Sequence, residues 1–195
     1  MIANSSFHFN PFSGVLHEDI PKVILPNIDI DQTIHRIQNS DSLALEFIGR
    51  QGRGKTSHLR YLQHILPEYP IFLLNSTSSV SDVMKNTSEI VFVDSIHHLS
   101  FSNRVQLFKE KKVVIYTTHW RRKIDCLLAK KEYHSIRFKG IEPEKLQAIL
   151  NERLKLASGS NTPETLFSIT DVNKLIRKFG DNYRGIINHL YEKYQ

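Results

Sequence analysis

One stretch decides the fold of this 195-residue chain, and it reads Gly49-Arg50-Gln51-Gly52-Arg53-Gly54-Lys55-Thr56. It matches the pattern G-x-x-x-x-G-K-[ST], in which glycines let the backbone curl so that successive N–H groups point at phosphate oxygens. Lys55 is expected to reach the β- and γ-phosphates, and the Thr56 hydroxyl to complete the shell of a Mg²⁺ ion. The pattern therefore predicts a phosphate-binding loop whose binding residues are Gly49, Gly52, Arg53, Gly54, Lys55, Thr56 and Ser57.

The segments on both sides of the loop favour this interpretation over a glycine-rich surface turn, which is the alternative for so short a pattern. The apolar run at residues 43–48 precedes the loop and is typical of a buried strand. Residues 57–66 follow it with leucine and isoleucine at helical spacing, and the pattern stops at Pro67. The predicted order is therefore strand, glycine loop, helix.

Length and composition limit the fold class. The length fits one ordinary domain with a small appendage, and a hydrophobic fraction of 40% with a charged fraction of 24% excludes wholesale disorder. The single cysteine, Cys126, excludes an internal disulfide and suits a reducing cytosol. Because the sequence has no apolar run of membrane-spanning length and no signal-peptide pattern, we expect a soluble, cytoplasmic protein.

Apolar runs and helical patterns alternate through the middle of the chain. Strands are expected at residues 43–48, 71–75, 89–94, 112–118 and 133–138. A helix is expected from residue 28 to 38, with Asp31 as its candidate cap, and another at residues 124–131. The alternation predicts an α/β fold, a parallel doubly wound sheet with right-handed crossovers and flanking helices.

Three regions are expected along the chain. Residues 1–40 are interpreted as a leader that packs on the core, and its phenylalanines and prolines predict extended, turn-rich backbone up to residue 28. Residues 41–140 form the predicted nucleotide-binding α/β domain. Residues 141–195 are expected to form a small lid of three helices, because their apolar residues recur at helical spacing.

A carboxylate closes the apolar run at residues 90–93. Asp94 follows the glycine loop by about forty residues, where a phosphate-loop protein needs a carboxylate on a neighbouring strand to hold Mg²⁺ through its waters. A strand that ends in aspartate is common, so the signal depends on the α/β pattern around it. We expect Thr56 and Asp94 to be the metal-site residues.

These motifs together resemble those of the AAA+ superfamily of P-loop ATPases, within it the compact initiators, helicase loaders and transposition regulators. The resemblance rests on the GKT loop, on Asp94, on a strand that ends in Thr117-Thr118, and on Gly180-Asp181-Asn182-Tyr183-Arg184 in the predicted lid. It covers nearly the whole chain. It implies ATP and Mg²⁺ as cofactors, a Walker A role for the GKT residues and a Walker B role for Asp94.

The resemblance also implies two sensors near the γ-phosphate. Thr118, or alternatively Thr117, would be the first sensor, and Arg184 would be the second, reaching from the lid. An arginine at a helix start gains nothing from the helix dipole, which by itself suggests an anionic partner, and the alternative is an ordinary surface arginine. With Lys55 and Asp94, these residues form the expected catalytic set.

One position departs from the pattern of the superfamily. Ser95 follows the Walker B aspartate, where the family usually has a glutamate that orients the attacking water, and a serine hydroxyl is a poor base. Hydrolysis is therefore expected to be slow or absent unless His97, His98 or His119 assists. Composition favours these histidines as loop residues.

Positive charge is concentrated between residues 104 and 139, where eleven Lys and Arg stand against three Asp and Glu in a chain of net charge +6. The run Arg121-Arg122-Lys123 beside Trp120 is interpreted first as a solvated loop, and alternatively as a contact for a nucleic-acid backbone with the indole stacked on a base. Neither this run nor Arg104 falls where an arginine finger is expected. The charge makes DNA or a DNA-bound protein the expected partner.

Two functions follow from these features. The first is an AAA+-like nucleotide-dependent switch or slow ATPase in a DNA-associated process, working through a nucleotide-dependent homo-oligomer or a protein partner. The alternative is an NTP-binding signalling or regulatory module with little or no hydrolysis, which Ser95 supports. A small-molecule kinase is a third option, against which the C-terminal position of the lid argues. The sequence lacks a guanine-reading Asn-Lys-x-Asp motif, which favours ATP.

Overall fold

A computed structural model describes residues 7–140, 142–159, 163 and 166–195. The chain forms two compact units. The sheet unit comprises residues 26–50 and 55–138. The helical unit comprises the described residues up to Leu25, the loop residues 51–54 and the described residues from Lys139 to Gln195.

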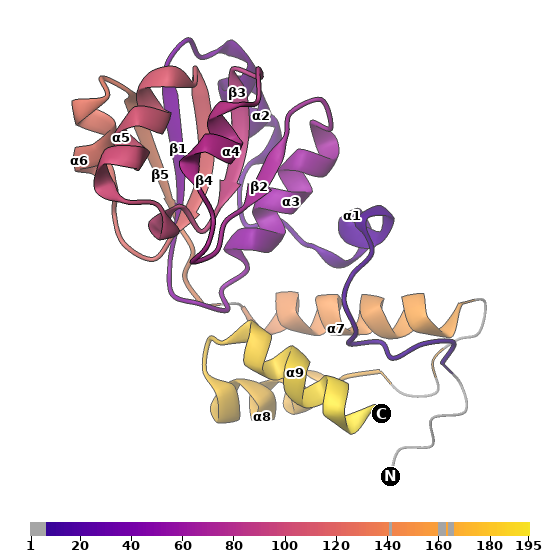
Figure 1. The fold of residues 1–195 in the computed structure, drawn as a ribbon. Helices are drawn as coiled ribbons and strands as arrows, with labels where there is room; N and C mark the ends of the chain where they lie inside the picture. Colours follow the sequence, from indigo (N-terminus) through magenta and orange to yellow (C-terminus); the bar gives the residue numbers. More distant parts are fainter. Residues whose placement is uncertain (1–6, 141, 160–162, 164–165) are drawn as a thin grey trace. The chain divides into compact units, whose positions relative to one another are not determined.

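The sheet unit is built on five parallel strands in the order β2-β3-β4-β1-β5 (Figure 1). The strands are β1 (Leu43–Ile48), β2 (Ile71–Leu73), β3 (Ile90–Asp94), β4 (Val113–Thr118) and β5 (Glu132–Arg137). The central strands β1 and β4 are buried along their whole length, as expected for strands covered on both faces. The prediction of a parallel, doubly wound α/β sheet is confirmed.

Helices cover both faces of this sheet. They are α2 (Ile30–Asn39), α3 (Lys55–Ile65), α4 (Val80–Met84), α5 (Phe101–Glu110) and α6 (Lys123–Leu128), with a short 3₁₀ helix η3 at Ile96–His98. The cap expected at Asp31 is wrong, because the Asp29 carboxylate accepts the hydrogen bond from the Gln32 N–H and the helix begins at Ile30. The helix expected at residues 124–131 already ends at Leu128.

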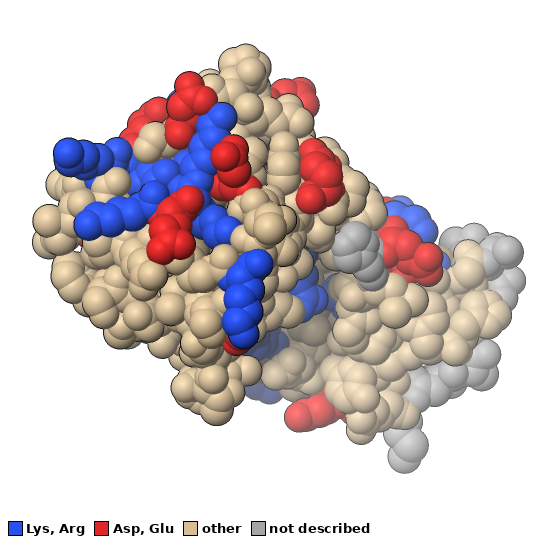
Figure 2. All heavy atoms as spheres, turned by 45° about the horizontal axis from the view of Figure 1, so that its top comes forward, with Lys and Arg blue, Asp and Glu red and all other residues tan. Residues whose placement is uncertain are grey.

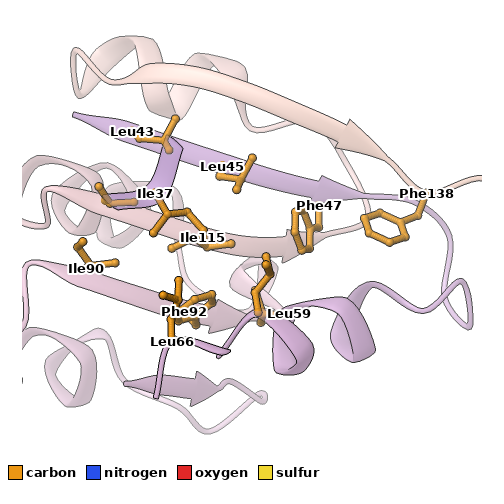
Figure 3. Packing of buried hydrophobic residues seen from close by; sticks show 12 residues of the cluster. Ile37, Leu43, Leu45, Phe47, Leu59, Leu66, Ile90, Phe92, Ile115 and Phe138 are labelled. Atoms are coloured by element: carbon orange, nitrogen blue, oxygen red, sulfur yellow. The ribbon is translucent and has the colours of Figure 1, made fainter. Parts of the chain in front are cut away.

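The alternation of side chains along β1 divides the core into two layers. Leu43, Leu45 and Phe47 point to one face, where they pack with Leu59 of α3 and Ile37 of α2 (Figure 3). Ala44 belongs to the cluster on the other face, which includes α5 and α6 residues. The first layer is apolar, whereas the second also holds the buried carboxylate of Glu46. The alternating burial fixes the register of the strand that leads into the glycine loop.

The helical unit contains α1 (Ile20–Val23), α7 (Pro143–Ser158), α8 (Ile169–Phe179) and α9 (Tyr183–Lys193), with a 3₁₀ helix η2 at His17–Asp19. Its core joins Phe12 of the leader to residues of all three C-terminal helices and to Tyr194, which follows α9. The helix residues are Leu146, Leu150, Leu154, Val172, Ile186 and Leu190. The sequence predicted no helix before residue 28, and α1 shows that this prediction is wrong. Pro21 is tolerated in α1 because it lies in the first turn, where a backbone N–H has no intrahelical partner.

Candidate nucleotide-binding site

The glycine loop connects β1 to α3 with a backbone that needs glycine. Gly52 and Gly54 have φ values of 79° and 80°, in the left-handed region. At Gly49 a Cβ atom would lie 2.6 Å from the carbonyl oxygen of Phe138. The helix α3 begins at Lys55, so the N–H groups of its first turn face the end of this loop.

Lys55 lies over the loop that precedes it. Its ammonium group donates hydrogen bonds to the carbonyl oxygens of Gly49 and Arg50, both at 2.8 Å. The side chain is only 7% exposed. These bonds hold the amino group next to the loop, and Ser57 lies half-buried in the first turn of α3.

Three oxygen groups from three elements meet at the carboxyl end of the sheet. Thr56 of α3 donates a hydrogen bond to Oδ1 of Asp94 at 2.9 Å, and Thr117 of β4 donates to the same oxygen at 2.6 Å. A hydroxyl and a carboxylate within hydrogen-bond distance are the ligand types that Mg²⁺ prefers. The residues present therefore fit a magnesium ion bound together with a triphosphate.

The two threonines at the end of β4 differ in direction. Thr118 donates its hydroxyl hydrogen bond to the carbonyl oxygen of Trp120 at 3.0 Å, so it closes the following turn. Thr117 contacts Asp94 and also accepts a hydrogen bond from the Ser95 N–H at 2.8 Å. The structure thus brings Thr117, the alternative candidate, to the aspartate.

Three histidines stack beside this site. The ring of His97 lies 4.4 Å from that of His98 and 4.8 Å from that of His119, centroid to centroid. Nδ1 of His119 is 3.2 Å from the carbonyl oxygen of Gly49 in the glycine loop. Burial, followed by the neighbouring His98 and His119, lowers the pKa of His97 to about 4, so this ring is neutral at neutral pH. Within the described part of the chain, no three His, Cys, Asp or Glu side chains are placed to hold a metal ion.

Comparison with known proteins gives matches only among solved structures, since no family model and no curated protein matches the chain. Cdc6p from Pyrobaculum aerophilum has a TM-score of 0.62 at 14% identity, over 94% of this chain and 64% of that one. The Thermotoga maritima RuvB Holliday junction branch migration motor has a TM-score of 0.56 at 11% identity, over 90% and 61%. A DNA replication initiation factor has a TM-score of 0.50 at 11% identity, over 87% and 66%.

The chain shares the fold of these three structures, which agrees with the fold that its resemblance to the AAA+ P-loop ATPases predicts. It spans less than two thirds of the length of each of these three structures. In the described residues, no helix combines the length and apolarity needed to cross a bilayer.

The AAA+ pattern did not point to Glu46, a buried carboxylate in the middle of β1. Its two oxygens accept hydrogen bonds from the hydroxyls of Tyr133 at 2.5 Å, Ser135 at 2.7 Å and Tyr116 at 3.3 Å, and from the Arg122 N–H at 2.8 Å. The sequence signal was a glutamate inside an otherwise apolar run. Glu46 fixes the start of α6, directly after the strand that carries the candidate first sensor.

The basic residues expected to face a partner are not equivalent. Arg104 is 7% exposed and donates to the Asp125 carboxylate at 2.5 Å, which excludes it as a freely presented arginine finger. Arg121 and Lys123 are exposed, whereas Arg122 is half-buried and burial lowers its pKa. Figure 2 shows Lys and Arg atoms (blue) gathered at the left, with Asp and Glu (red) among them.

The run Gly180-Asp181-Asn182-Tyr183-Arg184, on which the resemblance depends, leads from the end of α8 into the first turn of α9 in the helical unit. Asn182 caps this helix by accepting a hydrogen bond from the Gly185 N–H at 3.1 Å. Arg184 is exposed in its first turn. The loop residue Arg53, which belongs to the same unit, forms an ion pair with Asp181.

Proposed function

We propose that this chain binds ATP with Mg²⁺ and works as a nucleotide-dependent switch or slow ATPase in a DNA-associated process. The observation that carries the proposal is the convergence at the end of the sheet, where Asp94 accepts hydrogen bonds from Thr56 and Thr117 beside the glycine loop. A buried lysine at the mouth of the same loop supplies the positive charge that a triphosphate requires.

Each residue has a role in this proposal. The loop amides and Lys55, turning from the loop carbonyls, bind the β- and γ-phosphates. Thr56 and Asp94 hold the magnesium ion, which when bound neutralises phosphate charge. Thr117 orients the Asp94 carboxylate through its hydroxyl. Arg184 is proposed as the second sensor, an arginine at a helix start that suits an anionic partner.

The residues around Asp94 support slow turnover. Ser95 stands where the superfamily usually has a glutamate, and it adopts a left-handed backbone with φ 61°. A serine hydroxyl does not ionise near neutral pH, and a His97 with a pKa of about 4 is a weak base. Ser95 is therefore also the observation that favours the second candidate function, a regulatory module that binds nucleotide without hydrolysing it.

The proposed setting is cytoplasmic and associated with DNA, through a nucleotide-dependent homo-oligomer or a protein partner. The charge of +6 supports an anionic partner. Two structures of the same fold, a Holliday junction branch migration motor and a DNA replication initiation factor, support the DNA setting. Salt-sensitive binding is expected, since phosphate contacts release counterions.

A single-turnover phosphate-release assay separates the two candidates. With protein in excess over ATP and Mg²⁺, the switch with slow hydrolysis predicts phosphate release that Lys55→Ala abolishes. The exposed Lys109 provides the matched control, and Lys109→Ala should release phosphate at the parent rate. Nucleotide binding without release favours the regulatory module, and release that survives Lys55→Ala contradicts the assigned site.

A further inference from the structure

The short helix α6 presents apolar side chains to solvent. The exposed fractions are 66% for Trp120, 68% for Ile124, 58% for Leu127 and 54% for Leu128. Ile124, Leu127 and Leu128 are three and one residues apart, which places them along one stripe of α6, and Trp120 lies in the segment before the helix. Exposed cationic residues border this stripe, and we call the whole the α6 surface: Trp120, Arg121, Lys123, Ile124, Leu127, Leu128 and Lys130.

The inward face of α6 carries Asp125, a charged residue, and Cys126, which belongs to the apolar cluster on this side of the sheet. Asp125 is 5% exposed and accepts the hydrogen bond of Arg104 from α5, and Cys126 is fully buried next to the Tyr116 hydroxyl, 3.5 Å from it. A surface helix normally buries its apolar side and exposes its charges. In α6 three large aliphatic side chains are exposed while its one carboxylate is buried, and such an exposed apolar patch is typical of an interaction surface.

The helix α6, which carries the exposed aliphatic side chains, is held in place by buried contacts. The start of α6 is held by Glu46, which accepts the Arg122 N–H at 2.8 Å, and its middle by the Arg104–Asp125 ion pair. These contacts fix the helix before any partner binds. A fixed apolar stripe loses little conformational entropy on docking, which favours binding.

Charge determines the kind of partner. Between residues 119 and 131 the exposed charged side chains are Arg121, Lys123 and Lys130, all cationic, while the one acid in this segment, Asp125, is buried in its ion pair. Glu132, the next exposed acid, already lies 3.6 Å from Arg36. A second copy docking the same surface against itself would place like charges together, which costs binding energy.

The aliphatic stripe favours a protein over DNA as the partner of the α6 surface. Two or three aliphatic side chains in a row match the apolar stripe of a helix, whereas a phosphate backbone offers them no apolar counterpart. Arg122, the middle residue of the basic run, is half-buried, which leaves Arg121 and Lys123 as the exposed cations of that run. We propose that the α6 surface docks an amphipathic helix of a partner protein, with its apolar stripe on Ile124, Leu127 and Leu128 and its flanks rich in Asp and Glu.

Trp120 gives a direct readout, because it is the only tryptophan of the chain. The probes are two synthetic amphipathic peptides of about 18 residues, long enough to form a helix, with the same leucine stripe and either Glu or Lys flanks. With the full chain at low salt, the Glu-flanked peptide should shift Trp120 emission to shorter wavelength and bind at least about tenfold tighter than the Lys-flanked peptide, a preference that added salt reduces. Anisotropy of labelled peptide gives the affinities independently of Trp120.

Three variants make the test specific. Ile124→Asp should weaken binding of the Glu-flanked peptide about tenfold or more, since a buried unpaired carboxylate replaces an apolar contact. Its matched control is Leu73→Asp, a half-exposed leucine on β2 at the opposite edge of the sheet, which should bind as the parent does. The double variant Arg121→Glu, Lys123→Glu should reverse the preference toward the Lys-flanked peptide, and because all four substituted positions are exposed the fold should be kept.

Four outcomes would overturn the proposal. The first is equal binding of the two peptides by the parent, and the second is parent-like binding by Ile124→Asp. The third is a Trp120 emission that shifts with protein concentration alone, which would show that a second copy covers the surface. The fourth is a single-stranded oligonucleotide that displaces the Glu-flanked peptide from the parent and itself binds Ile124→Asp equally well, which would assign the surface to DNA.

Discussion

Glu46 is a fully buried carboxylate whose oxygens accept four hydrogen bonds, three from hydroxyls and one from the Arg122 N–H. Burial, together with the hydrogen bond to Glu46, raises the pKa of Tyr133 to about 12, so its hydroxyl keeps the proton that it donates. A buried acceptor with this many donors is costly to replace, because each lost bond leaves a polar group unpaired.

Glu46→Gln should therefore lower the free energy of unfolding by about 1–3 kcal/mol, since the amide NH₂ would face groups that donate. Urea unfolding followed by circular dichroism measures the change. Glu110, an exposed glutamate on α5, provides the control, and Glu110→Gln should stay within about 0.5 kcal/mol of the parent. Equal midpoints for the two variants would contradict the role given to Glu46.

His97 makes stability depend on pH. Its pKa is lowered from 6.5 to about 4 in the folded protein, mainly by burial, so between these values the unfolded chain binds the proton and the folded chain does not. The contribution is fully present above pH 6.5 and is lost as the pH falls toward 4. His97→Gln should flatten the fall in unfolding free energy over this window, as measured by urea unfolding at a series of pH values. Superimposable pH profiles for parent and variant would show that His97 does not titrate in this way.

The sequence could not show which of Thr117 and Thr118 contacts Asp94, for a reason that also lies at the residue scale. Successive residues of a strand point to opposite faces, so one of the two had to turn away from Asp94. Which one does so depends on the register of β4 against β3, where Tyr116 pairs with Val93. A single sequence contains no information on that register beyond the apolar pattern, which is continuous on both faces here.

At the scale of elements, the sequence predicted the parallel sheet and the glycine loop because buried strands and phosphate loops have local signatures. Element ends were less predictable. The chain turns at Lys130, which has φ 56°, to enter β5, so α6 ends earlier than its helical pattern suggested. The four-residue helix α1 has too few residues for a periodic pattern, and it packs in the helical unit near α7. Such ends are set by packing with segments distant in sequence.

The start of α8 is defined by a capping box. The Ser168 hydroxyl oxygen accepts a hydrogen bond from the Asp171 N–H, and the Asp171 carboxylate accepts one from the Ser168 N–H. Ser168→Ala should cost about 1 kcal/mol of unfolding free energy. Hydrogen exchange should show the loss in the first turn of α8, and Ser168→Thr, which keeps the hydroxyl, should restore most of the protection. Unchanged exchange in Ser168→Ala would mean that the cap does not hold this turn.

At the scale of the whole molecule, residues from both ends of the sequence build one core. Phe12 is 2% exposed and packs edge-on against Tyr194, with ring centroids 5.1 Å apart, and against Phe167 at 6.0 Å. The backbone adds to this, since the His8 N–H donates to the carbonyl oxygen of Ala157 at 2.9 Å. The described part of the leader up to Leu25 thus belongs to the helical unit, with Phe12 in its core, whereas residues 26–40 belong to the sheet unit.

Phe12→Ala should destabilise the helical unit by about 3–5 kcal/mol, through lost burial and the cavity left behind. Hydrogen exchange followed by mass spectrometry should show faster exchange in α7 and α9, with little change in β1 and β4. Phe9, which is 47% exposed in the same leader, gives the matched control, and Phe9→Ala should exchange like the parent. Uniformly faster exchange in both units would contradict a separate core for the helical unit.

Titration calorimetry of the full chain with ATP is the most direct test of whether the loop at residues 49–56 holds a nucleotide. With Mg²⁺ present, the parent should bind one ATP per chain, Lys55→Ala should lose this binding, and Asp94→Asn should weaken it chiefly through its magnesium dependence. No heat of binding from the parent at millimolar ATP and Mg²⁺, or binding that Lys55→Ala leaves intact, would contradict a nucleotide site at this loop.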